Sequence, residues 1–188
     1  SCHSPSSTWT STRSMPRVWA QATPAIGVGP GSRVRPATTD DTDELARLRW
    51  YFRVEHGTPV TRTFEEFATE FRAFVTDSLA GGARWRAWVA HADGRLVGCV
   101  WLQLVEMVPH PSRARWERPI AYVTNMYVEP DLRGAGLGAR LLDAAMGFAR
   151  EREVAEAIVW PTKRSASFYR RAGFGTGSAP LGMELAGD

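Results

Sequence analysis

A glycine-rich turn between an apolar strand and an amphipathic helix constrains this chain more than any other feature. The β-rich run 121–128 ends before Pro130, and glycines follow at positions 134, 136 and 138. Helical periodicity then begins, with an apolar face made by Leu137, Leu141, Ala145 and Phe148. Glycines remove the Cβ atoms that would hold a ligand away, and the first N–H groups of a helix point outward at its positive end. The sequence therefore predicts a strand–turn–helix unit that binds phosphate groups.

Three kinds of phosphate-binding turn can be compared with these residues. A nucleoside-triphosphate loop requires Gly-Lys-Ser/Thr, but Gly138 is followed by Ala139 and Arg140. A dinucleotide fingerprint reads G-x-G-x-x-G near the start of a fold, whereas this turn reads G-x-G-x-G and comes late in the chain. The third pattern, Arg-x-x-Gly-x-Gly, is matched by Arg133, Gly136 and Gly138. For this hexapeptide alone, a helix start that merely happens to be rich in glycine remains an alternative.

A second segment follows at short distance. Residues 157–160 are apolar and largely β-branched or aromatic, which is typical of a buried strand. A short helix is expected after the polar stretch 161–164. Gly173 stands where a glycine ends a helix, and Phe174 is placed to fold back onto that helix.

Together the two segments resemble the GCN5-related N-acetyltransferase (GNAT) family. In that family the Arg-x-x-Gly-x-Gly turn holds the pyrophosphate of acetyl-CoA, and a helix of the type Ala-x-x-Leu/Phe-Tyr-x-x-x-Gly-Phe closes the cofactor site. Ser165 stands where the family usually has alanine, and the matching residues are Phe168, Tyr169, Gly173 and Phe174. The resemblance extends from about Ser32 to the C-terminus.

The resemblance implies an α/β (α+β) fold with a mixed, mostly antiparallel central sheet flanked by helices, in the order β-α-α-β-β-β-α-β-α-β. The residues predict a first strand over 32–37 and a hairpin of strands 85–91 and 96–108 joined by Asp93-Gly94. A last strand is expected near 182–185.

Two helices are expected between the first strand and the hairpin. Asp41-x-x-Glu44 resembles a capping box and opens the first, which Gly57 ends. Thr63-x-x-Glu66 opens the second, and Gly81-Gly82 follows it. We expect its buried stripe to consist of Phe64, Phe67, Phe71 and Phe74.

The resemblance also implies a site for acetyl-CoA as co-substrate. The strand before the glycine turn would pair with the pantetheine arm, and the turn would bind the pyrophosphate. The implied cofactor-binding residues are Met126, Tyr127, Val128, Arg133, Gly134, Ala135, Gly136, Leu137, Gly138 and Ala139. The implied reaction is direct attack by an acceptor amine on the thioester, with Tyr169 as the catalytic residue that protonates the departing sulfur. A tyrosine that only packs on the cofactor is the alternative.

The proton acceptor and the acceptor substrate are less defined. Glu55 and Glu106 are candidate bases, Glu129 is interpreted as a turn residue, and a base acting through water is the preferred hypothesis. Thr162 replaces an asparagine often found in the family, which weakens any case for peptide specificity. Residues expected near the acceptor are Trp50, Tyr51, Arg53, Glu55, His110 and Trp116.

Composition limits the classes of binding partner and the cellular compartment that are expected for this chain. The net charge is +3, and scattered arginines do not indicate a nucleic-acid surface. No apolar run reaches the roughly 20 residues that span a bilayer, so no membrane partner is expected. Two cysteines and no Cys/His cluster favour a reducing cytoplasm and no metal.

We expect residues 1–31 to be a disordered or non-native segment and 32–188 to form a single N-acetyltransferase domain. The predicted function is acetyl-CoA-dependent transfer to a primary amine of a small molecule or peptide in a ternary complex, and a homodimer is left open. The alternatives are an acyl-CoA-binding sensor without turnover, transfer of another acyl group, and transfer to oxygen.

Overall fold

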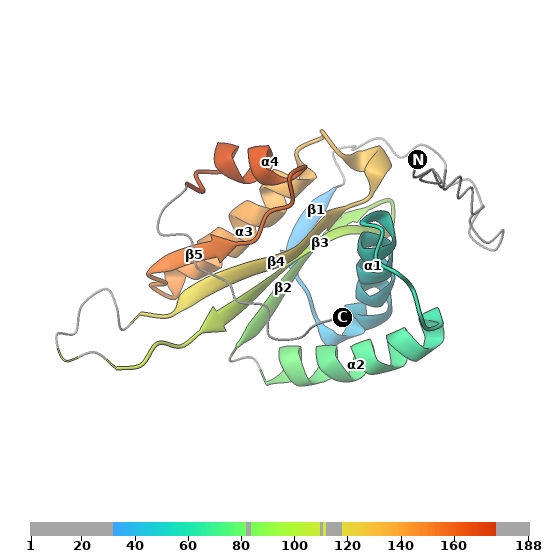
Figure 1. The fold of residues 1–188 in the computed structure, drawn as a ribbon, viewed down its shortest axis with the longest axis horizontal. Helices are drawn as coiled ribbons and strands as arrows, with labels where there is room; N and C mark the ends of the chain where they lie inside the picture. The colour runs from blue at the N-terminus through green and yellow to red at the C-terminus, as the bar shows by residue number, and fades with distance from the viewer. Residues whose placement is uncertain (1–31, 82–83, 110, 112–117, 176–188) are drawn as a thin grey trace, which may run out of the picture.

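A five-stranded sheet with helices on both faces organises the chain (Figure 1). The computed structural model describes residues 32–81, 84–109, 111 and 118–175. The strands lie in the order β1-β2-β3-β4-β5, and each pairs antiparallel with the next except β4 and β5, which are parallel. Their bounds are Arg33–Pro36, Trp85–Ala92, Arg95–Val105, Ile120–Val128 and Glu156–Val159.

Within the described residues, four α-helices and two 3-10 turns accompany these strands. One face carries α1 (Thr42–Glu55) and α2 (Phe64–Ala80). The other carries α3 (Leu137–Glu151) and α4 (Ala166–Arg171). The 3-10 turns are η2 (Thr39–Asp41) and η4 (Pro130–Leu132). No helix in the described part of the chain is long and apolar enough to cross a bilayer.

The order of elements from β1 to α4 confirms the sequence-based fold, and the strand expected near 182–185 lies outside the described residues. Two local predictions are also confirmed. Asp93 and Gly94 both have positive φ, at 48° and 78°, as the tight turn of a two-residue hairpin requires. Thr63 and Glu66 form the capping box of α2, with Thr63 N–H 2.7 Å from Glu66 Oε2 and Glu66 N–H 3.3 Å from Thr63 Oγ1.

The predicted capping box at Asp41 and Glu44 is wrong. The Asp41 carboxylate accepts from the backbone N–H of Thr38 at 2.8 Å and from the Arg35 guanidinium at 2.7 Å. It therefore caps η2 and ties that turn to β1, and it makes no capping hydrogen bond to α1. Glu44 pairs instead with Arg47 at 2.9 Å. Arg35 on β1 holds the Asp41 carboxylate away from the start of α1. Capping patterns in the local sequence cannot reveal a partner on another element.

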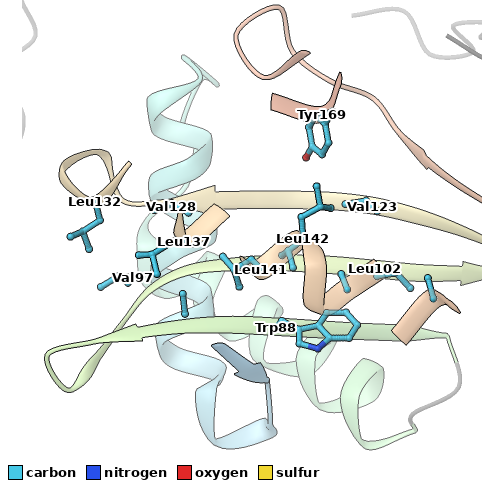
Figure 2. Packing of buried hydrophobic residues seen from close by; sticks show 14 of the residues in the cluster. Trp88, Val97, Leu102, Val123, Val128, Leu132, Leu137, Leu141, Leu142 and Tyr169 are labelled. Atoms are coloured by element: carbon cyan, nitrogen blue, oxygen red, sulfur yellow. The ribbon is translucent and has the colours of Figure 1, made fainter. Parts of the chain in front are cut away.

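The sheet separates two cores of different composition. On the α3 side the core is mainly aliphatic, with Leu137, Leu141 and Leu142 packed on Val97, Leu102 and Val123 (Figure 2). On the α1–α2 side it is rich in aromatic rings around Phe71 and Trp101. Phe64 and Phe67 are half-buried there, but Phe74 is 39% exposed, so its assignment to the buried stripe was wrong. It packs edge-on to Trp85 at the end of the cluster, where little covers it.

Gly98 marks the closest approach of β3 to β4. A Cβ at this position would lie 2.8 Å from the carbonyl oxygen of Tyr127 and 3.3 Å from the Leu141 side chain. No real Cβ approaches backbone so closely, so glycine is required here. The close contact holds the end of β4 against β3 and α3.

Candidate acyl-carrier and acceptor site

Beyond Val123, β4 continues without its parallel partner. Pairing with β5 runs from Ile120 opposite Glu156 to Val123 opposite Val159, whereas pairing with β3 continues to Val128. Among the residues that the structure describes, none pairs with the segment 124–128 on the β5 side, which is therefore an open edge there. The predicted residues Met126, Tyr127 and Val128 lie on it. An open edge can accept an extended ligand that pairs with its backbone as an added strand.

The glycine turn follows this open edge directly. Gly134 and Gly136 have φ of 82° and 84°, and Gly136 is the N-cap of α3. Among the described residues, none accepts a hydrogen bond from the N–H groups of residues 134–139, and the ladder of α3 begins with Arg140 N–H bonded to Gly136 O. A Cβ at either glycine would meet no protein atom within 4 Å. The turn thus presents unused donors beside open space, which is what an anion requires.

Arg133 is held by a carboxylate from α1. Its Nη1 and Nη2 lie 2.7 Å and 2.6 Å from the two oxygens of Glu55, and its Nε donates to Val128 O at 2.8 Å. Arg164, just before α4, also reaches Glu55 at 2.6 Å. The hydrogen bond from Arg133 and then that from Arg164 lower the pKa of Glu55 to about 2. So low a pKa makes Glu55 a weak proton acceptor, which argues against its role as the base.

Tyr169 extends from α4 toward β4 (Figure 2). It is 5% exposed and lies edge-on between Phe168 and Phe174, at ring-centroid distances of 5.1 Å and 5.5 Å. No described residue forms a hydrogen bond with its hydroxyl. Burial, and to a lesser degree the nearby Tyr122, raises the pKa of Tyr169 to about 12. The phenol therefore stays protonated at neutral pH and can serve as a proton donor.

Gly138 brings the glycine turn and Tyr169 together. A Cβ at position 138 would lie 3.5 Å from the ring of Phe168, the neighbour of Tyr169 in α4. The first turn of α3 is thus packed against α4. The glycine turn therefore lies beside α4, the helix that carries Tyr169.

Two further glutamates from the sequence analysis are Glu129, interpreted there as a turn residue, and Glu106, a candidate base. Glu129 accepts from Arg47 at 2.8 Å and from Arg95 at 2.6 Å. Burial opposes its ionisation, but these hydrogen bonds outweigh burial and lower the pKa of Glu129. It leads into η4 as a turn residue, and the two ion pairs that fasten it were not foreseen from the sequence. Glu106 is exposed beyond the end of β3.

The residues expected near the acceptor do not form one group in the structure. Trp50 and Arg53 line a cavity of about 230 Å³ between α1 and the segment that leads to α2. Tyr51 lines a second cavity of about 180 Å³ that Trp50 also borders. Glu55 is engaged with the glycine turn, and His110 and Trp116 lie outside the described residues.

Sequence reasoning missed Arg49. Its Nη1 donates to Asn125 Oδ1 at 2.9 Å, which joins α1 to the open edge of β4. The two residues are 76 positions apart, and no spacing or motif connects them.

Comparison with known proteins identifies the family. A family model described as the acetyltransferase (GNAT) domain matches residues 83–176, half of the chain. The chain belongs to the GNAT family. This confirms the resemblance drawn from the glycine turn and the Phe168-Tyr169 helix.

Two curated relatives share part of this GNAT chain. An uncharacterised N-acetyltransferase of Methanocaldococcus jannaschii is 26% identical over 160 residues, covering 75% of the chain and 59% of the relative. A glucosamine 6-phosphate N-acetyltransferase of Trypanosoma brucei brucei is 27% identical over 92 residues, covering 49% of the chain and 59% of the relative. The chain thus spans about 59% of the length of either relative.

Solved GNAT structures have the same fold. A GCN5-related N-acetyltransferase of Ralstonia eutropha has a TM-score of 0.68 at 27% identity, with 83% of this chain and 100% of that chain covered. A Clostridium acetobutylicum protein, described as a predicted acetyltransferase with acetyl-CoA, has a TM-score of 0.70 at 21% identity, with 82% and 96% covered. The expected GNAT-type fold is therefore confirmed.

Proposed function

We propose that this chain is an acetyl-CoA-dependent N-acetyltransferase that acts on a primary amine of a small molecule or peptide. Transfer takes place by direct attack within a ternary complex. Three observations carry the proposal: the open edge of β4, the unused N–H donors at the start of α3, and the packing of α3 against α4, the helix that carries Tyr169. The acetyl-CoA described with the C. acetobutylicum protein is consistent with this choice of co-substrate.

The carrier is held mainly by backbone groups. Met126, Tyr127 and Val128 offer an extended edge for the pantetheine arm, and the N–H groups of residues 134–139 converge on the diphosphate. One contact between an anion and a helix start contributes about 0.3–1 kcal/mol, and up to about 2 kcal/mol when partly buried, so several donors must act together. Since Glu55 already neutralises the Arg133 guanidinium, these N–H groups supply most of the attraction.

Tyr169 is the proton donor to the leaving sulfur. A phenol with a pKa of about 12 is badly matched to a thiol in water, whose pKa is roughly 8.5. Burial acts on sulfur as well, however: in the same sheet it raises the pKa of the Cys99 thiol to about 12. Burial disfavours a thiolate as it disfavours a phenolate, so a closed site would move both pKa values in the same direction and reduce the mismatch.

Water takes the proton from the attacking amine. An amine of pKa about 10.4 requires roughly 4.6 kcal/mol to lose its proton at pH 7. Glu55 and Glu129 are each bound by two arginines and have lowered pKa values, so neither is a ready proton acceptor. We assign that role to a water chain from the open edge of β4 to solvent.

Thiol release from acetyl-CoA with a panel of amines tests the proposal. We expect release that saturates with acetyl-CoA and that depends on at least one amine. Calorimetry with coenzyme A supplies the independent measurement of carrier binding. A folded protein that shows no saturable binding of coenzyme A would refute the assignment.

A second candidate is an acyl-CoA-binding domain without turnover. The arginine-bound state of Glu55 and Glu129 favours it, because neither carboxylate is then a ready base. Binding of coenzyme A together with unaccelerated thiol release, for every amine tried, would identify this function. Release that requires a different acyl thioester or an alcohol would instead indicate another acyl group or an oxygen acceptor.

A further inference from the structure

The cavity beside α1 carries an excess of positive charge. It has a volume of about 230 Å³ and is lined by Arg49, Trp50, Arg53, Val54, Thr58, Pro59, Val60, Thr61, Arg62 and Phe67. Three of these residues are arginines, and none is an acid. Arg62 is neutralised by Glu70 on α2, so Arg49 and Arg53 define the charge of the cavity.

Arg49 differs from its neighbour Arg47 on the same helix. Arg47 is satisfied by Glu44 and Glu129 at 2.9 Å and 2.8 Å. Arg49 is half-buried, donates only to the neutral Asn125 side chain, and lies over the ring of Phe52 at 5.6 Å. Within the described residues it has no carboxylate partner. Burial, and then the charge of Arg53, lowers the pKa of Arg49. A half-buried guanidinium without an anion is costly, and a ligand that brings the anion would relieve that cost.

The position of Arg49 links the cavity to the carrier site. Asn125, its partner, lies on the part of β4 that β5 leaves open, and it has a positive φ of 52°. Arg49, which lines the cavity, therefore also contacts the strand that the proposed function assigns to the pantetheine arm, from the α1 side of the sheet. Arg53, one turn further along α1, is exposed and lines the outer part of the cavity.

We propose that the acceptor amine carries an anionic group, a carboxylate or a phosphate, which Arg49 and Arg53 bind in this cavity. The inference rests on the proposed function and deepens it by naming the substrate class. A guanidinium matches the paired oxygens of either anion in a fork of two hydrogen bonds. The volume lies below the roughly 300–1,000 Å³ typical of whole drug-sized ligands, so the cavity suits one end of a small acceptor. Polycationic amines are disfavoured by the same charge.

Matched acceptors that differ only in the anionic group provide the test. Glucosamine 6-phosphate is compared with glucosamine, and β-alanine with its amide, by thiol release at saturating acetyl-CoA. We expect at least one anionic member to have kcat/KM about tenfold or more above that of its neutral partner. The pair that shows the larger ratio distinguishes phosphate from carboxylate. Efficient transfer to neutral or polycationic amines, without preference for either anion, would overturn the inference and leave the proposed function intact.

Two variants and a control assign the effect to the cavity. Arg49→Gln and Arg53→Gln are expected to raise KM for the preferred anionic acceptor by roughly 10- to 100-fold, since a charge-assisted hydrogen bond is lost. KM for acetyl-CoA should remain within about twofold in both. Arg72→Gln removes an exposed arginine that pairs with Asp43 outside the cavity, so it should change neither constant.

The variants also distinguish a failure of the acceptor assignment from a failure of the proposed function. Arg53 is exposed, so Arg53→Gln is expected to fold even if Arg49→Gln does not. A rise in KM for acetyl-CoA that equals the rise for the acceptor would move these arginines to the carrier site and refute the inference. Absence of coenzyme A binding in the unmodified chain would instead refute the proposed function itself.

Discussion

The carrier side and the acceptor side of this molecule are built in different ways. On the carrier side, β4, the glycine turn, α3 and α4 follow one another within residues 120–171, and the proposed ligand contacts are mostly backbone groups. On the acceptor side, α1 meets β4 through side chains: Arg49 and Asn125 are 76 positions apart. Backbone recognition leaves a local glycine pattern in the sequence, whereas side-chain recognition across the fold leaves none.

The largest expected effect concerns Tyr169, which we propose to act on the carrier side alone. Tyr169→Phe is expected to lower kcat by roughly 10²–10⁴ because the proton donor to sulfur is lost. Coenzyme A affinity, measured by calorimetry, should change little since the ring remains. An unchanged kcat in Tyr169→Phe would reduce this residue to packing.

A change at Gly98 would disturb both sides at once, because this glycine fixes the end of β4. In Gly98→Ala the new Cβ meets the Tyr127 carbonyl oxygen at 2.8 Å, so the backbone must move. We expect the free energy of unfolding to fall by roughly 1–3 kcal/mol, measured by urea denaturation. A stability equal to that of the unmodified protein would mean that β3 and β4 separate easily here.

A change at Gly136 should affect only the carrier side. A valine at φ of 84° is strained, and its side chain fills the space before the N–H donors. We expect Gly136→Val to weaken coenzyme A binding about tenfold or more in calorimetry, with acceptor preference retained. Gly147→Ala in the middle of α3, where a Cβ meets nothing within 4 Å, is the control. Tight binding by Gly136→Val would count against the turn as the diphosphate site.

The smallest effect is expected from the ion pairs of Glu55 with Arg133 and Arg164, which connect α1 to the carrier side. In the folded protein the pKa of Glu55 is about 2, below its ordinary value of 4.5. The carboxylate therefore stabilises the fold fully above about pH 4.5, and this contribution is lost as the pH falls toward 2. We expect Glu55→Gln to cost less than about 1 kcal/mol at pH 7, since the arginines are partly exposed. The difference from the unmodified protein should vanish near pH 2.

The same variant tests the base. With the pKa of Glu55 held low, Glu55→Gln should retain kcat within a few-fold, and Glu65→Gln, at an exposed position of α2, is the control. A fall in kcat of a hundredfold, specific to Glu55→Gln, would restore Glu55 as the proton acceptor.

Features formed by residues close together in the sequence could be predicted, and features formed by distant residues could not. The glycine turn, the Asp93-Gly94 hairpin and the Thr63 cap depend on residues within a few positions of one another, and their elements formed as expected. The Asp41 box failed because Arg35 on β1 attracts that carboxylate away from α1. The pairing of Arg133 with Glu55 and the cavity of Arg49 needed the fold itself, since their partners come from distant elements. The roles proposed for the site residues stay predictions until the variants are measured.

The helix α1 contacts the carrier side at two positions. Arg49 and Glu55 both belong to α1, about 9 Å apart along its axis. Glu55 is fastened to the glycine turn, and Arg49 reaches Asn125. Because a helix is stiff along its axis, α1 holds its contact with the glycine turn and its contact with β4 at a fixed spacing.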